Sequence, residues 1–114
     1  MKQVDSITLA ELNEMSGNFF CDMVKADVDV AQGLIAVDAE LHADIEQFML
    51  DSGSRQEDLW GINLYPGLFG TPGFIEFDSI INIKPRQHNR SRYVEDADIR
   101  DRITDIVLKV VVDG

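Results

Sequence analysis

DVDVAQGLIAVD, residues 27–38, carries the clearest strand signal in the chain. Apolar and acidic residues alternate before Gln32-Gly33, and apolar residues dominate after it. Successive side chains of a strand point to opposite faces of its sheet, so this alternation is typical of strands with one buried face. A two-residue turn at Gln32-Gly33 would place Val28 opposite Val37. We therefore predict a hairpin with one apolar face and one acidic face.

Two further segments are predicted to extend this sheet. Residues 60–65 and 74–84 both alternate between apolar and polar side chains, which predicts a third and a fourth strand. Between them, residues 66–73 (PGLFGTPG) contain three glycines and two prolines. Because glycine and proline interrupt regular structure, this segment is predicted to be a loop.

Three helices are predicted to accompany the strands. Thr8 and Glu11 form a capping box, and the apolar residues that follow recur at helical spacing, which predicts a helix over residues 9–24. A second, short helix over residues 43–52 would end at Gly53. The third helix follows residue 92, and its apolar stripe consists of Ile99, Ile103, Ile106, Val107, Val110 and Val111.

These elements predict an α+β fold in the order α-β-β-α-β-β-α. Two hairpins and three amphipathic helices fit a four-stranded antiparallel sheet with helices on one face, in two layers. No repeat and no linker interrupts residues 1–114, a length that suffices for one hydrophobic core. We therefore predict a single domain.

The composition indicates an acidic globular protein. A net charge of −11 disfavours nucleic acid as a partner, because binding to nucleic acid draws on a basic surface. The chain has no run of the ~18 apolar residues that a membrane span needs, and no signal-peptide pattern, so we predict a soluble, cytoplasmic protein. Cys21 is the only cysteine, which excludes an internal disulfide, and its apolar neighbours predict a buried thiol.

The predicted uncovered face of the sheet is rich in polar side chains. Like charges on adjacent strands cost stability, so we expect something to compensate for the carboxylates there. Three explanations stay open: solvation with screening by salt, a divalent cation, and a basic loop that folds back over the face. The residues of this face are Asp27, Asp29, Asp38, Asn63, Tyr65, Glu76, Asp78, Asn82 and Lys84.

The basic stretch 84–92, KPRQHNRSR, contains four of the ten basic residues of the chain and no acidic one. Arg86, Arg90 and Arg92 precede a helix, and guanidinium groups near a helix N-terminus are suited to bind a phosphate or a carboxylate. The same arginines are suited to ion pairs with the acidic face of their own chain. Ion pairs with the acidic face of a second copy would instead make a homodimer.

A metal site is a further hypothesis. Glu40, His42, Glu76 and Asp78 offer the oxygen and imidazole ligands that Mg²⁺ or Mn²⁺ accept. With an arginine to stabilise developing negative charge, they would suit a metal-dependent hydrolase of a small phosphorylated or otherwise anionic substrate. Their spacing matches no specific metal-binding motif.

The segments ELHAD (40–44), QEDLWGINLYP (56–66), FIEFDSIINIKP (74–85) and NRSRYVED (89–96) resemble those of one prokaryotic family. That family is catalogued only as a domain of unknown function. The resemblance extends over most of the chain from residue 23 onward, and it implies a complete, free-standing domain. It implies no activity, ligand or catalytic residue.

Two hypotheses about function remain open, and the sequence leaves undecided whether the protein is an enzyme. The first is a small non-enzymatic binding or interaction module, expected to form a homodimer or to bind a protein or a small anionic ligand. The second is the metal-dependent hydrolase, for which a divalent cation would be the cofactor. The predicted binding residues of the module are Arg86, Arg90, Arg92, Asn63, Asn82 and Tyr65.

Overall fold

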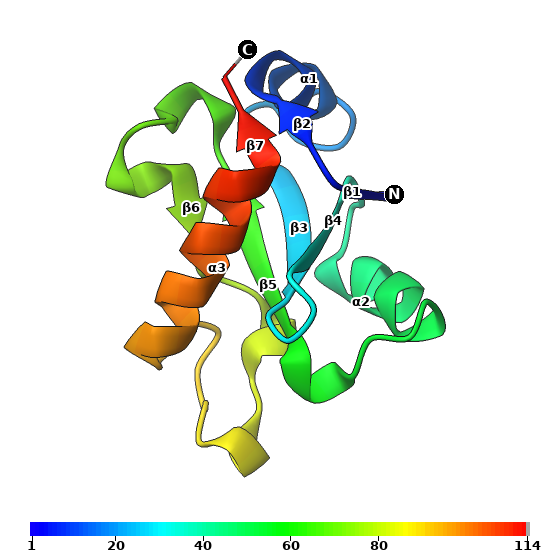
Figure 1. Cartoon of the computed structure of the whole chain (residues 1–114), viewed down its shortest axis with the longest axis vertical. Coiled ribbons are helices and arrows are strands. Elements are labelled where there is room, and N and C mark those ends of the chain that lie inside the picture. Colours follow the sequence, from blue (N-terminus) through cyan, green and yellow to red (C-terminus); the bar gives the residue numbers. More distant parts are fainter. Residues whose placement is uncertain (114) are drawn as a thin grey trace.

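The structure, a computed structural model, describes residues 1–113 and has an α+β fold, as predicted. Five strands form an antiparallel sheet in the order β1-β4-β3-β5-β6 (Figure 1). These strands are β1 (Lys2–Val4), β3 (Val24–Asp29), β4 (Leu34–Val37), β5 (Leu59–Leu64) and β6 (Ile75–Glu76). Two short strands, β2 (Ile7–Thr8) and β7 (Val111–Val112), form a separate parallel pair. The helices are α1 (Leu9–Met15), α2 (His42–Asp51) and α3 (Ala97–Val110).

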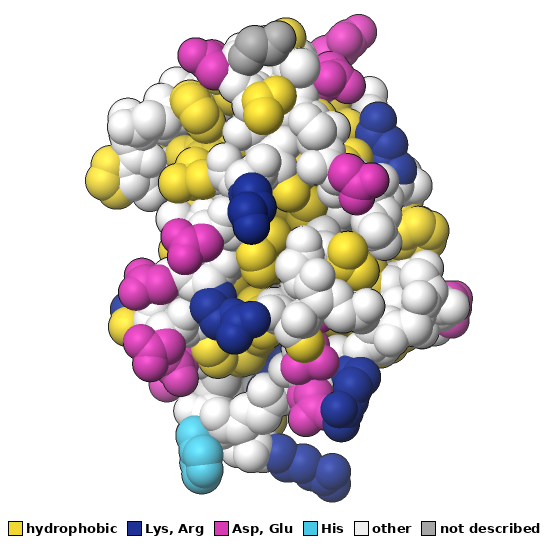
Figure 2. All heavy atoms as spheres, viewed as in Figure 1, with side chains coloured by type: hydrophobic (Ala, Val, Ile, Leu, Met, Phe, Trp, Pro, Cys, Tyr) yellow, Lys and Arg dark blue, Asp and Glu magenta, His cyan; other side chains and the backbone are white. Residues whose placement is uncertain are grey.

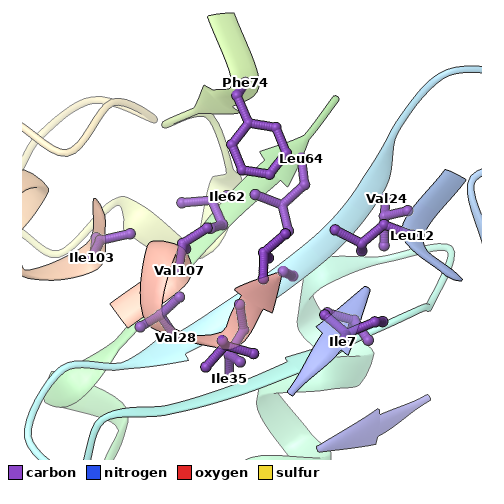
Figure 3. Packing of buried hydrophobic residues seen from close by; sticks show 14 of the residues in the cluster. Ile7, Leu12, Val24, Val28, Ile35, Ile62, Leu64, Phe74, Ile103 and Val107 are labelled. Carbon is purple, nitrogen blue, oxygen red and sulfur yellow. The ribbon is translucent and has the colours of Figure 1, made fainter. Parts of the chain in front are cut away.

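Helices cover both faces of the sheet, which corrects the predicted two-layer arrangement. Along β4, Ile35 and Val37 belong to a large apolar cluster that includes residues of α1 and α3 (Figure 3). Ala36 lies between them and belongs instead to a smaller cluster with Ile45 and Met49 of α2. Figure 1 shows α2 and α3 on opposite sides of the strands. The periodicity of a helix predicts that it has an apolar face, but it does not say which face of the sheet it covers.

The central hairpin forms with a different register from the predicted one. Val28 lies opposite Ile35, two residues from the predicted partner Val37. The turn is longer because the Asp29 carboxylate accepts hydrogen bonds from the backbone N–H groups of Ala31 and Gln32, both at 2.9 Å. Side chains alternate with a period of two, so a shift of two residues leaves every side chain on its predicted face.

The predicted fourth strand is mostly irregular. Only β6 pairs with β5; of the rest, residues 80–82 form a 3₁₀ turn and residues 77–79 have no regular structure. The side chain of Asn82 takes the place of a neighbouring strand: Oδ1 accepts from the Gly61 N–H at 2.8 Å, and Nδ2 donates to the Gly61 carbonyl at 3.0 Å. A Cβ atom on Gly61 would lie 2.6 Å from the Ser79 Cβ, so this close approach requires glycine.

The first helix is shorter than the predicted 9–24. It ends at Met15, and the chain from there to β3 forms turns and bends. Gly17 stands where the helix would continue, and glycine destabilises a helix interior by about 1 kcal/mol relative to alanine. Cys21 falls in this irregular segment and is exposed, so the prediction of a buried thiol was wrong.

The third helix forms after the basic stretch, as predicted, over Ala97–Val110, and it ends one residue before the predicted apolar stripe does. Asp96 caps its N-terminus by accepting a hydrogen bond from the Asp98 N–H at 2.8 Å. Val111, predicted on its stripe, leaves the helix and pairs in parallel with Ile7. Strands β1, β2 and β7 were absent from the predicted order because two or three residues are too few for a periodic signal. None of the helices within residues 1–113 is both long enough and apolar enough to cross a membrane.

Candidate functional site

The acidic side chains of β3 lie beneath α2, and not in solvent as predicted. Asp27 and Asp29 are both fully buried. Asp29 is well provided with donors, since Ser54 Oγ lies 2.7 Å from its Oδ2 and the N–H groups of Ala31 and Gln32 donate to its Oδ1. Burial alone would raise the pKa of Asp29, but these hydrogen bonds outweigh burial and hold the pKa below its ordinary value.

Asp27 is the opposite case. Within residues 1–113, neither of its carboxylate oxygens has a hydrogen-bond partner. Burial raises the pKa of Asp27 to about 9, Glu46 adds to the rise, and Lys84 and Lys25 oppose it. Asp27 is therefore protonated at neutral pH and contributes no charge to a recognition surface.

The basic stretch folds into a loop that is held by two side chains. Asn89 is buried, and its Nδ2 donates to the carbonyls of Ser91 and Tyr93 at 3.1 and 2.7 Å. One carboxylate oxygen of Glu95 accepts from the N–H groups of Arg90 and Ser91 at 2.8 and 2.9 Å. These contacts fix the backbone of the loop through its own side chains, so its shape needs no ligand.

The four basic side chains of this loop do not all converge on one point, although Lys84 and Arg86 line the same hollow of about 630 Å³. The largely buried ammonium of Lys84 donates to a backbone carbonyl at 2.8 Å. Arg92 Nε donates to Asp78 Oδ1 at 2.7 Å. The loop therefore neutralises one carboxylate of the predicted acidic face through this ion pair. Arg86 and Arg90 are exposed, and neither makes an ion pair within residues 1–113.

Four predicted residues do meet, where β5 runs beside β6. Asn63 Nδ2 donates to Glu76 Oε1 at 2.8 Å and to the Asp78 carbonyl at 3.3 Å, and the Tyr65 hydroxyl donates to Glu76 Oε1 at 3.1 Å. Burial raises the pKa of Tyr65, and Glu76, Asp22 and Asp78 raise it further. Because Asp78 is paired with Arg92, the negative potential around this hydroxyl comes mainly from Glu76 and Asp22.

His42 and Glu40 were predicted as metal ligands together with Glu76 and Asp78. His42 is buried at the start of α2, and its Nε2 donates to the Ile62 carbonyl at 2.8 Å. Burial lowers the pKa of His42 to about 4, so the ring is neutral. Glu40 is exposed in the segment before α2. Within residues 1–113, no three His, Cys, Asp or Glu side chains are grouped so that they could hold a metal ion, so the geometry does not favour this set.

A hollow of about 620 Å³ opens beside β6, and we call it the β6 hollow. Leu68, Ile75, Phe77 and Tyr93 give it apolar and aromatic walls, and Tyr65 and the carboxylates of Glu76 and Asp78 also line it. The rings of Phe77 and Tyr93 meet edge to face, with centroids 6.2 Å apart. In Figure 2, hydrophobic side chains are exposed over the loop between β5 and β6, at the upper left. The hollow thus joins apolar surface to acidic groups.

The sequence interpretation found only part of this site. Alternation placed Asn63, Tyr65, Glu76 and Asp78 on one face, but Phe77 and Tyr93 were not singled out as site residues. Phe77 belongs to the apolar half of an alternating run, which predicts burial in the core. Tyr93 offered the better signal, since it is a single aromatic residue in the polar run NRSRYVED. Asn82 was predicted to bind a ligand, but its amide is engaged within the protein.

Comparisons with known proteins give a family and no function. No curated protein and no solved structure matches the chain. The model of one family, described as a protein of unknown function (DUF5674), matches residues 3–110. This confirms the expected membership of a family known only as a domain of unknown function. Since the match extends over nearly the whole sequence, the chain belongs to the DUF5674 family.

Proposed function

We propose that this protein is a small, non-enzymatic binding module whose recognition surface is the β6 hollow. One observation carries the proposal: exposed aromatic and apolar side chains share a concave surface with two carboxylates. Ligand sites are usually concave and mostly apolar, with a few polar groups that fix the orientation of the ligand. The exposure of Leu68 and Tyr93, at 46% and 48%, leaves apolar surface that a ligand would cover.

The ligand that we propose carries a positive charge beside an apolar group. The negative potential around the Tyr65 hydroxyl, due mainly to Glu76 and Asp22 since Arg92 pairs with Asp78, favours a cation. Aromatic rings add to this preference because their faces attract cations. One face of the Tyr93 ring is already occupied by the Arg100 guanidinium, 4.9 Å from its centroid, so only the opposite face is left for a ligand.

A small anionic ligand has less support. Among the three predicted arginines, Arg92 is paired with Asp78, and none of them lines the hollow. A homodimer built on an open acidic face has also lost part of its basis, because α2 covers Asp27 and Asp29. The hydrolase has the least support, since its four proposed ligands do not form a metal-binding group within residues 1–113.

The test is a titration followed by amide resonances in a ¹⁵N–¹H spectrum. Phenethylammonium is the cationic probe, and phenylpropionate, of similar size, is the anionic control. We expect the cation to shift the amide resonances of residues 75–78 and of Tyr93 more than the anion does. Tyr93→Ala should weaken these shifts, whereas Phe19→Ala should not, because Phe19 is equally exposed at 52% but does not line the hollow.

Two results would count against the proposal. Equal shifts with the cation and the anion would remove the argument from charge. Shifts that are confined to other surfaces would show that the hollow is not the binding site.

A further inference from the structure

We infer that the ligand of the β6 hollow is an extended, basic polypeptide segment that pairs with the free edge of β6. This inference rests on the proposed function, and it adds the chemical class of the ligand and its mode of binding.

The first argument is the backbone of β6. The Tyr65 N–H donates to the Phe74 carbonyl at 2.9 Å, and Asn63 lies opposite Glu76 in the ladder. In an antiparallel ladder, alternate residues bond to the same neighbour, so Phe74 and Glu76 face β5. Ile75 and Phe77 therefore direct their N–H and C=O groups away from the sheet. Within residues 1–113, no backbone or side-chain hydrogen bond from another segment reaches these groups on the outer side.

The second argument is the extent of this edge. β6 is the last strand of the sheet, and an unpaired edge is a ready template for another strand. Its free part ends at Ser79, whose N–H donates to the Arg92 carbonyl at 3.1 Å. The edge that remains, residues 75–77, would pair with about three residues of an extended segment, which span roughly 10 Å. A short segment of a partner is thus enough to fill it.

The third argument is the pattern of side chains beside the edge. Glu76 points to one face of the sheet, where Asn63 and Tyr65 hold its carboxylate. Ile75 and Phe77 point to the other face, where they pack against the large apolar cluster. A strand added here would place alternate side chains beside the carboxylate and beside the apolar walls. The matching ligand alternates basic and apolar residues.

The negative charge of the chain favours a basic segment over a second copy of the chain as the partner of β6. Each copy has a net charge of −11, and pairing of β6 with itself would bring the carboxylates of two hollows together. Like charges that face one another across strands are destabilising. A basic segment meets the same carboxylates with opposite charge.

The test measures the fluorescence anisotropy of a labelled short peptide of alternating lysine and valine. We expect it to bind, and we expect the same peptide with N-methylated backbone amides to bind at least about tenfold more weakly, a loss of ~1.4 kcal/mol. Methylation removes the donors that would pair with β6 and leaves the lysine charges. A peptide with glutamate in place of lysine should not bind. Glu76→Gln should weaken binding. Asp5→Asn is the control and should leave binding unchanged, because Asp5 is an exposed acidic residue beside β1, at the far edge of the sheet.

Each other outcome overturns the inference. If both peptides bind equally, pairing with the strand edge is wrong. If no peptide binds although phenethylammonium shifts the resonances of the hollow, a polypeptide ligand is wrong and the proposed function survives. If neither peptide nor phenethylammonium binds, both proposals fail. If the free protein sediments as a dimer that Tyr93→Ala dissociates, the occupant is a second copy.

Discussion

The two faces of the central sheet bury different kinds of side chain. Toward α1 and α3, sixteen buried apolar residues form one cluster, whereas the cluster under α2 has five, so most of the apolar burial lies on the first face. The second face also encloses Asp27, Asp29 and His42. An apolar side chain needs only to be covered, but a buried polar one needs a partner of its own. Asp29 has such partners and, within residues 1–113, Asp27 has none, so burial raises the pKa of Asp27 whereas hydrogen bonds hold that of Asp29 below its ordinary value.

The largest expected effect is a cavity in the larger cluster. Ile62 of β5 is fully buried there, so Ile62→Ala should lower the free energy of unfolding by ~3–5 kcal/mol. Met49→Ala, in the smaller cluster that α2 forms with the sheet, should cost less, ~2–3 kcal/mol, because this cluster has more freedom to collapse around the change. Urea unfolding of both variants measures the difference. A larger loss for Met49→Ala would reverse the ranking of the two faces.

The second effect is a dependence of stability on pH. Burial raises the pKa of Asp27 from 3.8 to about 9, so between these values the native protein keeps a proton that the unfolded chain releases. The free energy of unfolding therefore falls as the pH rises through this window, by at most ~1.4 kcal/mol per pH unit. Asp27→Asn should abolish this slope above neutral pH, as measured by urea unfolding at several pH values.

Of the other buried ionisable groups, His42 and Asp29 do not disturb this measurement, whereas burial lowers the pKa of Lys84, which makes stability rise with pH in the alkaline range and opposes the Asp27 slope there. Burial lowers the pKa of His42 from 6.5 to about 4, so its contribution makes stability rise with pH between those values and is constant above them. The pKa of Asp29 lies below its ordinary value, so Asp29→Asn should keep the slope of the wild type above neutral pH. A flat wild-type profile there would show that Asp27 is ionised in the native state.

A smaller effect is expected from Gly61→Ala, which tests how closely the chain after β6 packs on β5. The new Cβ would meet Ser79 at 2.6 Å, and overpacking of a core costs ~1–3 kcal/mol. The double variant Gly61→Ala with Ser79→Gly should recover most of this loss, because it removes the atoms in conflict. If the second substitution recovers nothing, the contact between the two residues is not the cause.

The smallest effect is expected at the surface pair of Arg92 and Asp78. Both side chains are about half exposed, at 52% and 46%, and exposed pairs of this kind contribute ~0.2–1 kcal/mol. Arg92→Ala should cost no more than this, and the cost should shrink at high salt. Arg90→Ala is the control, since Arg90 makes no ion pair within residues 1–113. A large loss that does not depend on salt would assign Arg92 a role beyond the pair.

Local sequence patterns predicted where the helices and strands of this fold lie better than they predicted how these elements pair and pack with one another. Alternation located β3, β4 and β5, and apolar spacing located α2 and α3. It could not predict the register of the hairpin, because the turn depends on hydrogen bonds to the side chain of Asp29. It also failed for residues 77–84, where the side chain of Asn82 replaces a strand.

The same limit applies to the candidate site. The alternation of side chains along the predicted strands placed Tyr65, Glu76 and Asp78 on one face of the sheet. Because the two strands were predicted to be neighbours, these side chains were expected to lie close together. The burial of Asp27 was missed, since an alternating acidic strand is typical of a face open to solvent, and only the position of α2 overrides that expectation. Tyr93 reaches the hollow from a loop that is held by Asn89, a contact between segments that no spacing predicts.

The parallel pairing of β2 with β7 has a consequence for the order of events during synthesis. Ile7 and Leu12 are buried in the large cluster, and Ile7 pairs with Val111. At roughly 5–20 residues per second, a ribosome needs about 5–20 s to deliver Val111 after Ile7 has appeared. Until then the first apolar residues of the nascent chain lack their neighbour, and the seam between β2 and β7 can close only after α3 has been made.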